Sequence, residues 1–111
     1  MAELSKDAEQ KIKQLQLLEQ NIQNFSMQRQ SFQSQALEIE NALDQLEKTK
    51  GATYKIVNSI MISVPKEDLK KELQSKKEVV DLRIKSVEKQ ENKLKEQASE
   101  IQAEVMKHLQ K

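Results

Sequence analysis

Residues 54–64 read YKIVNSIMISV, and this short stretch decides how the rest of the chain is interpreted. It is rich in β-branched residues, and Asn58-Ser59 at its centre fits a two-residue turn. We therefore predict a β-hairpin over residues 52–64. Because an isolated two-stranded hairpin is only marginally stable in water, we expect its strands to pair with strands from other copies or subunits. The chain is then part of an oligomer.

The segment before the hairpin predicts one long helix over residues 3–50. Alternating steps of three and four residues run from Ala8 to Leu46, as is typical of a coiled-coil seam. Lys48 suits a helix C-terminus, and Gly51 suits a left-handed cap after it. The predicted seam positions are Ala8, Lys11, Leu15, Leu18, Ile22, Phe25, Arg29, Phe32, Ala36, Ile39, Leu43 and Leu46.

The segment after the hairpin predicts a second helix over residues 65–110. Pro65 fits a first helical turn, where Glu67 and Asp68 complement the positive end of the helix. Its seam positions are Lys70, Leu73, Lys77, Val80, Ile84, Val87, Glu91, Leu94, Ala98, Ile101, Val105 and His108. The predicted fold is mainly α: one domain over residues 1–111, a long antiparallel two-helix coiled coil with one central β-hairpin.

The two seams also predict how the helices face each other. One register places Leu15 opposite Ile101 and Leu43 opposite Leu73. The residue midway in sequence between each facing pair is then Asn58, in the proposed turn. The heptads alone allow shifts of one heptad either way, so the turn position selects this register.

In this register Arg29 and Glu91 come close enough to meet across the seam. A polar seam residue often specifies register, and we suggest that role for this pair. The alternative is that both side chains extend to water.

Composition excludes several classes of protein. The net charge of +1 argues against a strongly basic nucleic-acid binder, and the chain has no stretch of about 20 apolar residues that would cross a membrane. The chain has no cysteine, and its N-terminus has no apolar signal core, so we expect a cytoplasmic protein without disulfides. His108 is the only histidine, and no Gly-rich phosphate loop is present. We therefore expect neither an enzyme nor a metal or cofactor site.

Apolar residues outside or at the end of the seams mark candidate contact surfaces. Any single one is adequately explained as ordinary surface, but they gather in two groups. Near the free helix ends lie Leu4, Ile12, Leu17, Met106 and Leu109. Near the hairpin lie Leu37, Leu69, Val79 and Leu82. We expect the first group to contact a client and the second to pack against other subunits.

The hairpin with its flanks resembles the beta-type subunit of prefoldin. The resemblance covers essentially the whole chain. It is carried by residues 52–64, the Lys-Glu-Asp-Leu that starts the second helix, the opening Met-Ala-Glu-Leu, and the stretch from Arg83 to Glu91. Beta-type members have one hairpin and alpha-type members have two, and this chain has room for one. It departs from the family at Asn58, where Gly is usual, although Asn also tolerates positive φ. The short, cysteine-free chain is more similar to archaeal members.

The resemblance implies an ATP-independent holding chaperone. Four beta-type and two alpha-type subunits would join their hairpins into a β-barrel, and the coiled-coil tips would capture non-native proteins for a group II chaperonin. The tip residues would be Leu4, Ile12, Leu17, Met106 and Leu109. The oligomerisation residues would be Tyr54, Ile56, Val57, Ile60, Met61, Ile62 and Val64.

Two other functions fit a coiled coil. A structural adaptor or tether would use its exposed apolar residues for one defined partner, but it needs no hairpin. An RNA-binding arm would need a basic stripe, whereas Lys and Glu interleave here, as in Lys85, Glu88 and Lys89.

Overall fold

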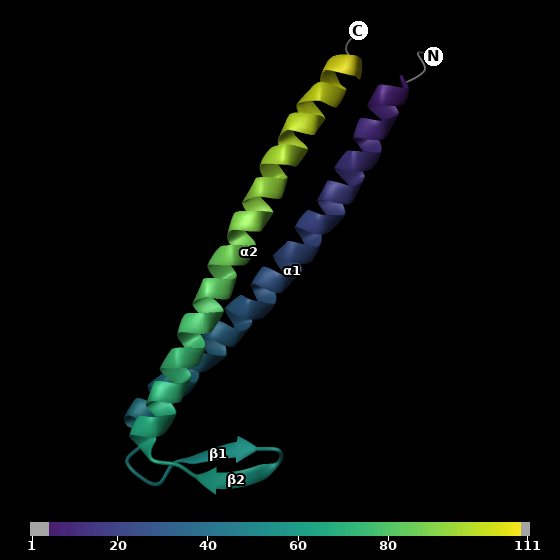
Figure 1. The fold of residues 1–111 in the computed structure, drawn as a ribbon. Coiled ribbons are helices and arrows are strands. Elements are labelled where there is room, and N and C mark those ends of the chain that lie inside the picture. The colour runs from purple at the N-terminus through teal and green to yellow at the C-terminus, as the bar shows by residue number, and fades with distance from the viewer. Residues whose placement is uncertain (1–4, 110–111) are drawn as a thin grey trace. The chain divides into compact units, whose positions relative to one another are not determined.

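The computed structural model describes residues 5–109. Helix α1 spans Lys6–Lys48, strand β1 spans Tyr54–Val57, strand β2 spans Ile60–Ser63, and helix α2 spans Lys66–Leu109 (Figure 1). The predicted order of helix, hairpin and helix is confirmed.

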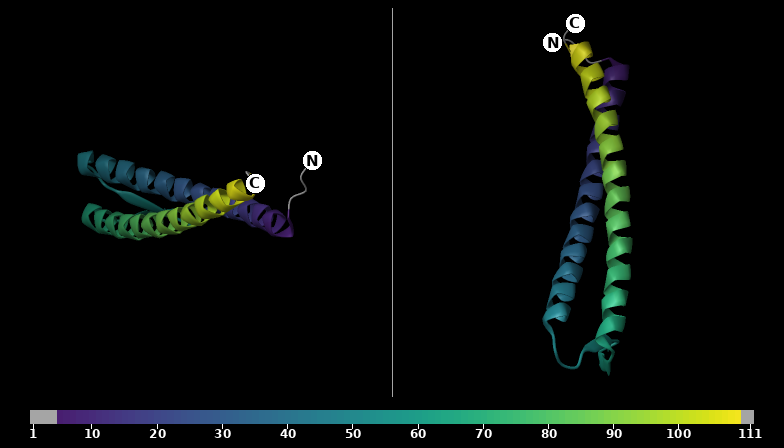
Figure 2. Two further views of the ribbon diagram at one scale, coloured as in Figure 1. Left: turned by 90° about the horizontal axis from the view of Figure 1, so that it is seen from above. Right: turned by 90° about the vertical axis from the view of Figure 1, so that its left-hand side faces the viewer.

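The described chain forms two compact units. Residues 5–29 and 85–109 make up the terminal unit, and residues 30–84 make up the hairpin unit. In each unit a segment of α1 and a segment of α2 run side by side in opposite directions (Figures 1 and 2). In the hairpin unit, β1 and β2 extend sideways from the helix ends (Figure 1).

The predicted seams form the interior of both units. Every predicted seam position of α1 is buried or half-buried, and so is every one of α2 except His108, which is exposed. The most deeply buried side chains are all seam residues: Ala8, Leu46, Val80, Val87, Glu91 and Val105. Burial along one stripe of each helix is what a two-helix coiled coil requires.

Ion pairs across the helices agree with the predicted register. In the hairpin unit Lys77 Nζ lies 3.1 Å from Glu40 Oε1. In the terminal unit Lys11 Nζ lies 3.0 Å from Glu104 Oε2. The predicted register places Ile39 opposite Lys77 and Val105 opposite Lys11. Each glutamate is the sequence neighbour of that facing residue, so the heptad prediction holds within each unit.

The C-terminus of α1 is capped differently from the prediction. Gly51 does not have a positive φ, so the expected left-handed glycine cap is wrong. Instead, the Thr49 hydroxyl donates to the Gln45 carbonyl at 2.8 Å, and the Lys66 ammonium donates to the Thr49 carbonyl at 3.1 Å. These donors satisfy carbonyls at the end of α1, which therefore ends at Lys48 rather than at residue 50.

The helix starts also differ slightly from the prediction. The Ala8 amide donates to the Ser5 hydroxyl at 3.1 Å, so Ser5 is an N-cap and α1 begins at Lys6 rather than at residue 3. The Leu69 amide donates to the Pro65 carbonyl at 3.1 Å, so Pro65 directly precedes the first residue of α2. The predicted end of the second helix at residue 110 lies outside the described residues.

The hairpin turn is formed as predicted. Asn58 and Ser59 have φ angles of 49° and 69°, the left-handed pair that a type I′ turn requires. The strands are antiparallel, with Ile56 paired to Met61 and Val57 paired to Ile60. The amide of Val64 donates to the Thr53 carbonyl at 3.1 Å, which extends the pairing beyond the strands.

Candidate functional site

The hairpin presents apolar side chains on both of its faces. Residues that pair directly across an antiparallel ladder share a face, and successive residues alternate between faces. One face therefore carries Tyr54, Ile56, Met61 and Ser63, and the other carries Lys55, Val57, Ile60 and Ile62. A solvated sheet face is normally polar, so two apolar faces are typical of a sheet that is covered on both sides.

Almost all of the predicted oligomerisation residues are exposed. Ile56 is 72% exposed and Met61 is 66% exposed. Val64 is half-buried, and the exposed members are Tyr54, Ile56, Val57, Ile60, Met61 and Ile62. The sheet within the described residues has two strands, so each strand has one edge without a paired neighbour. Open edges and apolar faces together make this hairpin a surface suited to strand addition.

The hairpin is fixed against the helices of its own unit. The Lys55 ammonium forms an ion pair with the Glu72 carboxylate of α2, and the hydrogen bond from Lys55 lowers the pKa of Glu72. Beside this pair, Tyr54 lines an open hollow of ≈ 270 Å³ whose walls include Leu46 of α1 and Leu73 of α2. The sequence pattern did not reveal this anchor, because Lys55 and Glu72 lie outside the seam.

The terminal unit exposes a second set of apolar side chains. Of the predicted tip residues, Leu17, Met106 and Leu109 are exposed, and Ile12 is half-buried. Lys11, next to Ile12, forms an ion pair with Glu104, two residues before Met106. This pair places Ile12 and Met106 at a similar level of the two helices. Leu4 lies outside the described residues.

Met27 is an exposed apolar residue that the sequence reasoning missed. Its side chain is 63% exposed on α1 in the terminal unit. Met27 lies two residues from each of the seam positions Phe25 and Arg29. A large apolar residue outside the seam was therefore the feature of the sequence that could have identified it as exposed. In the hairpin unit Leu37, Val79 and Leu82 are exposed, and Leu69 is half-buried.

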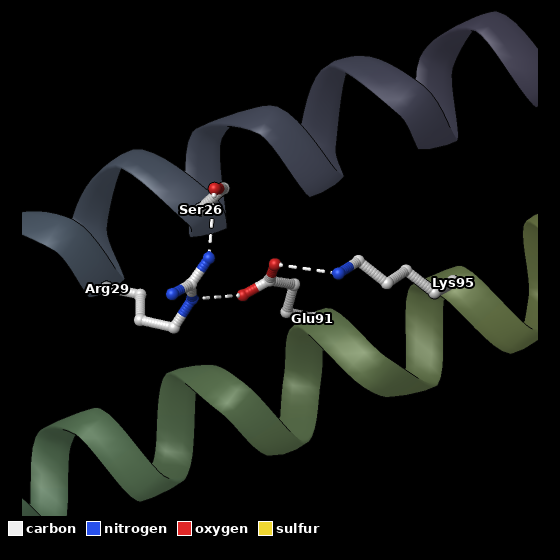
Figure 3. A network of polar contacts seen from close by, with 4 residues as sticks. All are labelled: Ser26, Arg29, Glu91 and Lys95. Carbon is white, nitrogen blue, oxygen red and sulfur yellow. Dashed lines mark hydrogen bonds and ion pairs between the residues drawn. The ribbon is translucent and has the colours of Figure 1, made fainter.

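Arg29 and Glu91 meet inside the terminal unit. The Arg29 Nε donates to Glu91 Oε2 at 2.8 Å, and Lys95 Nζ lies 3.1 Å from Glu91 Oε1 (Figure 3). The Arg29 Nη2 also donates to the Ser26 hydroxyl at 3.3 Å. Of the two alternatives left by the sequence, contact across the seam is therefore the one adopted; its role in register stays a proposal.

The surroundings of Glu91 explain how a carboxylate is kept in a seam. The residue is only 3% exposed, so an unpaired charge there would be unfavourable. The hydrogen bonds from Arg29 and then Lys95 lower the pKa of the Glu91 carboxyl. The ionised form is thus the one that the terminal unit stabilises.

Neither a metal centre nor a membrane segment is found in residues 5–109. No group of three His, Cys, Asp or Glu side chains is placed to hold a metal ion there. Over the same residues, neither α1 nor α2 is both long and apolar enough to cross a lipid bilayer.

The geometry defines a class of protein, an antiparallel two-helix coiled coil that carries an exposed β-hairpin between its helices. Comparison with known proteins agrees with this description. A family model described as "Prefoldin subunit" matches residues 9–111. The crystal structure of the prefoldin beta subunit from Thermococcus strain KS-1 matches with a TM-score of 0.95 at 27% identity, covering 100% of this chain and 99% of that one.

Curated relatives show the same pattern in sequence. The prefoldin beta subunit of Archaeoglobus fulgidus is 38% identical over 104 residues, which cover 92% of this chain and 90% of the relative. That of Sulfolobus acidocaldarius is 33% identical over 99 residues, covering 87% and 79%. This chain belongs to the prefoldin family. Membership supports a chaperone role and agrees with the expectation of a non-enzymatic protein.

Proposed function

We propose that this chain is a beta-type subunit of a hexameric, ATP-independent holding chaperone, assembled from four beta-type and two alpha-type subunits. In this proposal the hairpins join into a β-barrel. The terminal unit captures non-native proteins, which are then passed to a group II chaperonin. The observation that carries the proposal is the hairpin with two apolar faces and two open edges.

Burial of the hairpin supports the assembly part of the proposal. Fully burying a large apolar side chain contributes roughly 1.5–3 kcal/mol, and six such side chains are exposed on this hairpin. The outer backbone groups of β1 and β2 would gain hydrogen bonds from neighbouring strands at the same time. A monomer would leave both requirements unmet.

The exposed residues of the terminal unit support the client-binding part. The exposed large apolar side chains of the terminal unit are few, namely Leu17, Met27, Met106 and Leu109, so one terminal unit would bind an unfolded chain weakly. Several units of one hexamer acting on one client would raise the overall affinity through effective concentration. Weak individual contacts also allow release without a nucleotide. Met106 suits varied clients because its unbranched side chain adapts to different surfaces.

The test is to mix this chain with an alpha-type prefoldin subunit. We expect light scattering to report a discrete hexamer, and we expect that hexamer to suppress aggregation of unfolded proteins without ATP. A chain that stays monomeric with the partner present would contradict the assembly. A hexamer that binds only one defined protein would favour a structural adaptor instead.

A further inference from the structure

The outer face of α1 in the terminal unit carries few charges. Between Lys13 and Arg29 the only charged residue of α1 is Glu19. Steps of three and four place Leu17, Gln20, Asn24 and Met27 along one side of the helix, with Gln16 and Gln23 beside them, and all six side chains are exposed. We call these six residues the amide face.

The partner helix in the same unit has the opposite character. The outer face of α2 carries exposed charges in the same three-and-four steps, at Lys89, Lys93, Glu96 and Glu100. Charges of both signs are enough to keep a surface soluble, and α2 supplies them. Solubility therefore does not explain why α1 replaces charge with amides over this stretch.

We propose that the amide face binds extended segments of unfolded polypeptide irrespective of their charge. This inference rests on the proposed holding function and specifies which chemistry of the client is bound. A primary amide has a donor and an acceptor, so Gln and Asn side chains match the peptide groups that an unfolded chain exposes. Urea, a diamide, solvates peptide and apolar groups in the same way.

The placement of Leu17 and Met27 fits this partner. They are ten positions apart in the sequence, a distance of about 15 Å along a helix. An extended chain of roughly four or five residues spans the same distance. The two side chains would bind apolar client residues while the amides between them bind the client backbone.

Because the amide face carries no charge, it can bind clients of different net charge. A charged surface attracts clients of one sign and repels those of the other, which is how charge gives specificity. An uncharged face cannot discriminate in this way. Unfolded proteins of any net charge would therefore bind it equally well.

The experiment gives the amide face a charge. In one variant Gln16, Gln20 and Gln23 are replaced by Glu, and in a second variant the same three are replaced by Lys. A control variant carries Gln90→Glu, Asn92→Glu and Gln97→Glu, which change the net charge by the same amount as the Glu variant does, at exposed positions of α2 in the same unit. Each full-length chain is assembled with the alpha-type subunit, and binding of unfolded, reduced α-lactalbumin (acidic) and unfolded, reduced lysozyme (basic) is titrated.

We expect the wild type and the control to bind both clients equally well. The Glu variant should bind the acidic client about three- to tenfold more weakly and keep the basic one, and the Lys variant should show the reverse. Binding that is unchanged in both variants would overturn the role of the amide face and leave the holding function intact. A wild-type hexamer that binds neither client would overturn both proposals.

Discussion

The hairpin and the terminal unit both expose apolar side chains, but they expose them in different surroundings. On the hairpin the apolar residues are contiguous, cover both faces and lie beside open strand edges. In the terminal unit Leu17 and Met27 are separated by amides. A continuous apolar surface with directional backbone groups suits one permanent partner, whereas spaced apolar residues among neutral amides suit partners that change.

The largest expected effect comes from placing a charge in the hairpin. In Ile62→Asp the new carboxylate would be buried between subunits without a partner, so we expect the hexamer to be lost while helix content is kept. Light scattering and circular dichroism measure the two properties. Leu17→Asp, which places the same charge in the terminal unit, should leave the mass unchanged. A normal hexamer from Ile62→Asp would show that the hairpin does not close the assembly.

Client holding should respond to the terminal unit instead. The variant that tests this replaces the exposed Leu17, Met106 and Leu109 with Ser. Ile12 is left unchanged because it is half-buried. We expect this variant to lose most suppression of client aggregation, since three of the four exposed large apolar side chains of the terminal unit are removed and Met27 alone remains, and we expect it to assemble normally.

The matched control for this variant replaces Leu37 and Leu82 with Ser. Because these two side chains were expected to pack against other subunits, light scattering first establishes that the control still forms the hexamer. These side chains are similarly exposed but belong to the hairpin unit. Aggregation assays on hexamers of verified mass compare the two. Equal loss of holding in both variants would remove the distinction between the two regions.

The ion pair inside the terminal unit should matter for stability rather than binding. Arg29→Leu leaves Glu91 buried with Lys95 as its remaining partner, so we expect a loss of about 2–4 kcal/mol in the free energy of unfolding. Lys11→Leu, which breaks the more exposed pair with Glu104, should cost less. Urea denaturation of each variant measures both changes. Similar small losses would mean that Arg29 contributes no more than a surface charge.

The smallest expected effect is a dependence of stability on pH. The folded-state pKa of Glu91 is lowered, so its contribution to stability is complete above the usual value of 4.5 and is lost as pH falls through the folded value. Glu47 and Glu72 also have lowered pKa values, so acid should destabilise the wild type through several groups. Glu91→Gln should lose less stability on acidification than the wild type. Parallel thermal-unfolding curves against pH would contradict this assignment.

Features that depend on local periodicity were predictable from the sequence. The steps of three and four identified the buried stripe of both helices, because a coiled coil repeats its contacts at that spacing. Asn58 and Ser59 were identifiable as the turn because few residue pairs join two β-branched runs so closely. The exposed hairpin residues followed from the same argument.

Apart from the contact of Arg29 with Glu91, features that depend on which long side chain reaches which partner were not predictable. Gly51 is of the residue type that commonly caps a helix C-terminus, yet the side chains of Thr49 and Lys66 satisfy the carbonyls at the end of α1. The pair of Lys55 with Glu72 lies outside any repeat. Met27 lies on the outer face of α1, away from both the seam and the helix ends, so neither pattern identifies it.

Patterns in the sequence are enough to specify two long helices, their seams, their mutual register and the hairpin between them. Each of these follows from a short-range pattern that repeats or from the backbone preference of a particular residue. The sequence placed Arg29 and Glu91 within reach of each other but left open whether they meet, and the structure shows that they do. That Lys66 caps α1 and that Lys55 anchors the hairpin became visible only in the folded chain. Flexible charged side chains have several partners within reach, and packing of the surrounding residues selects one of them.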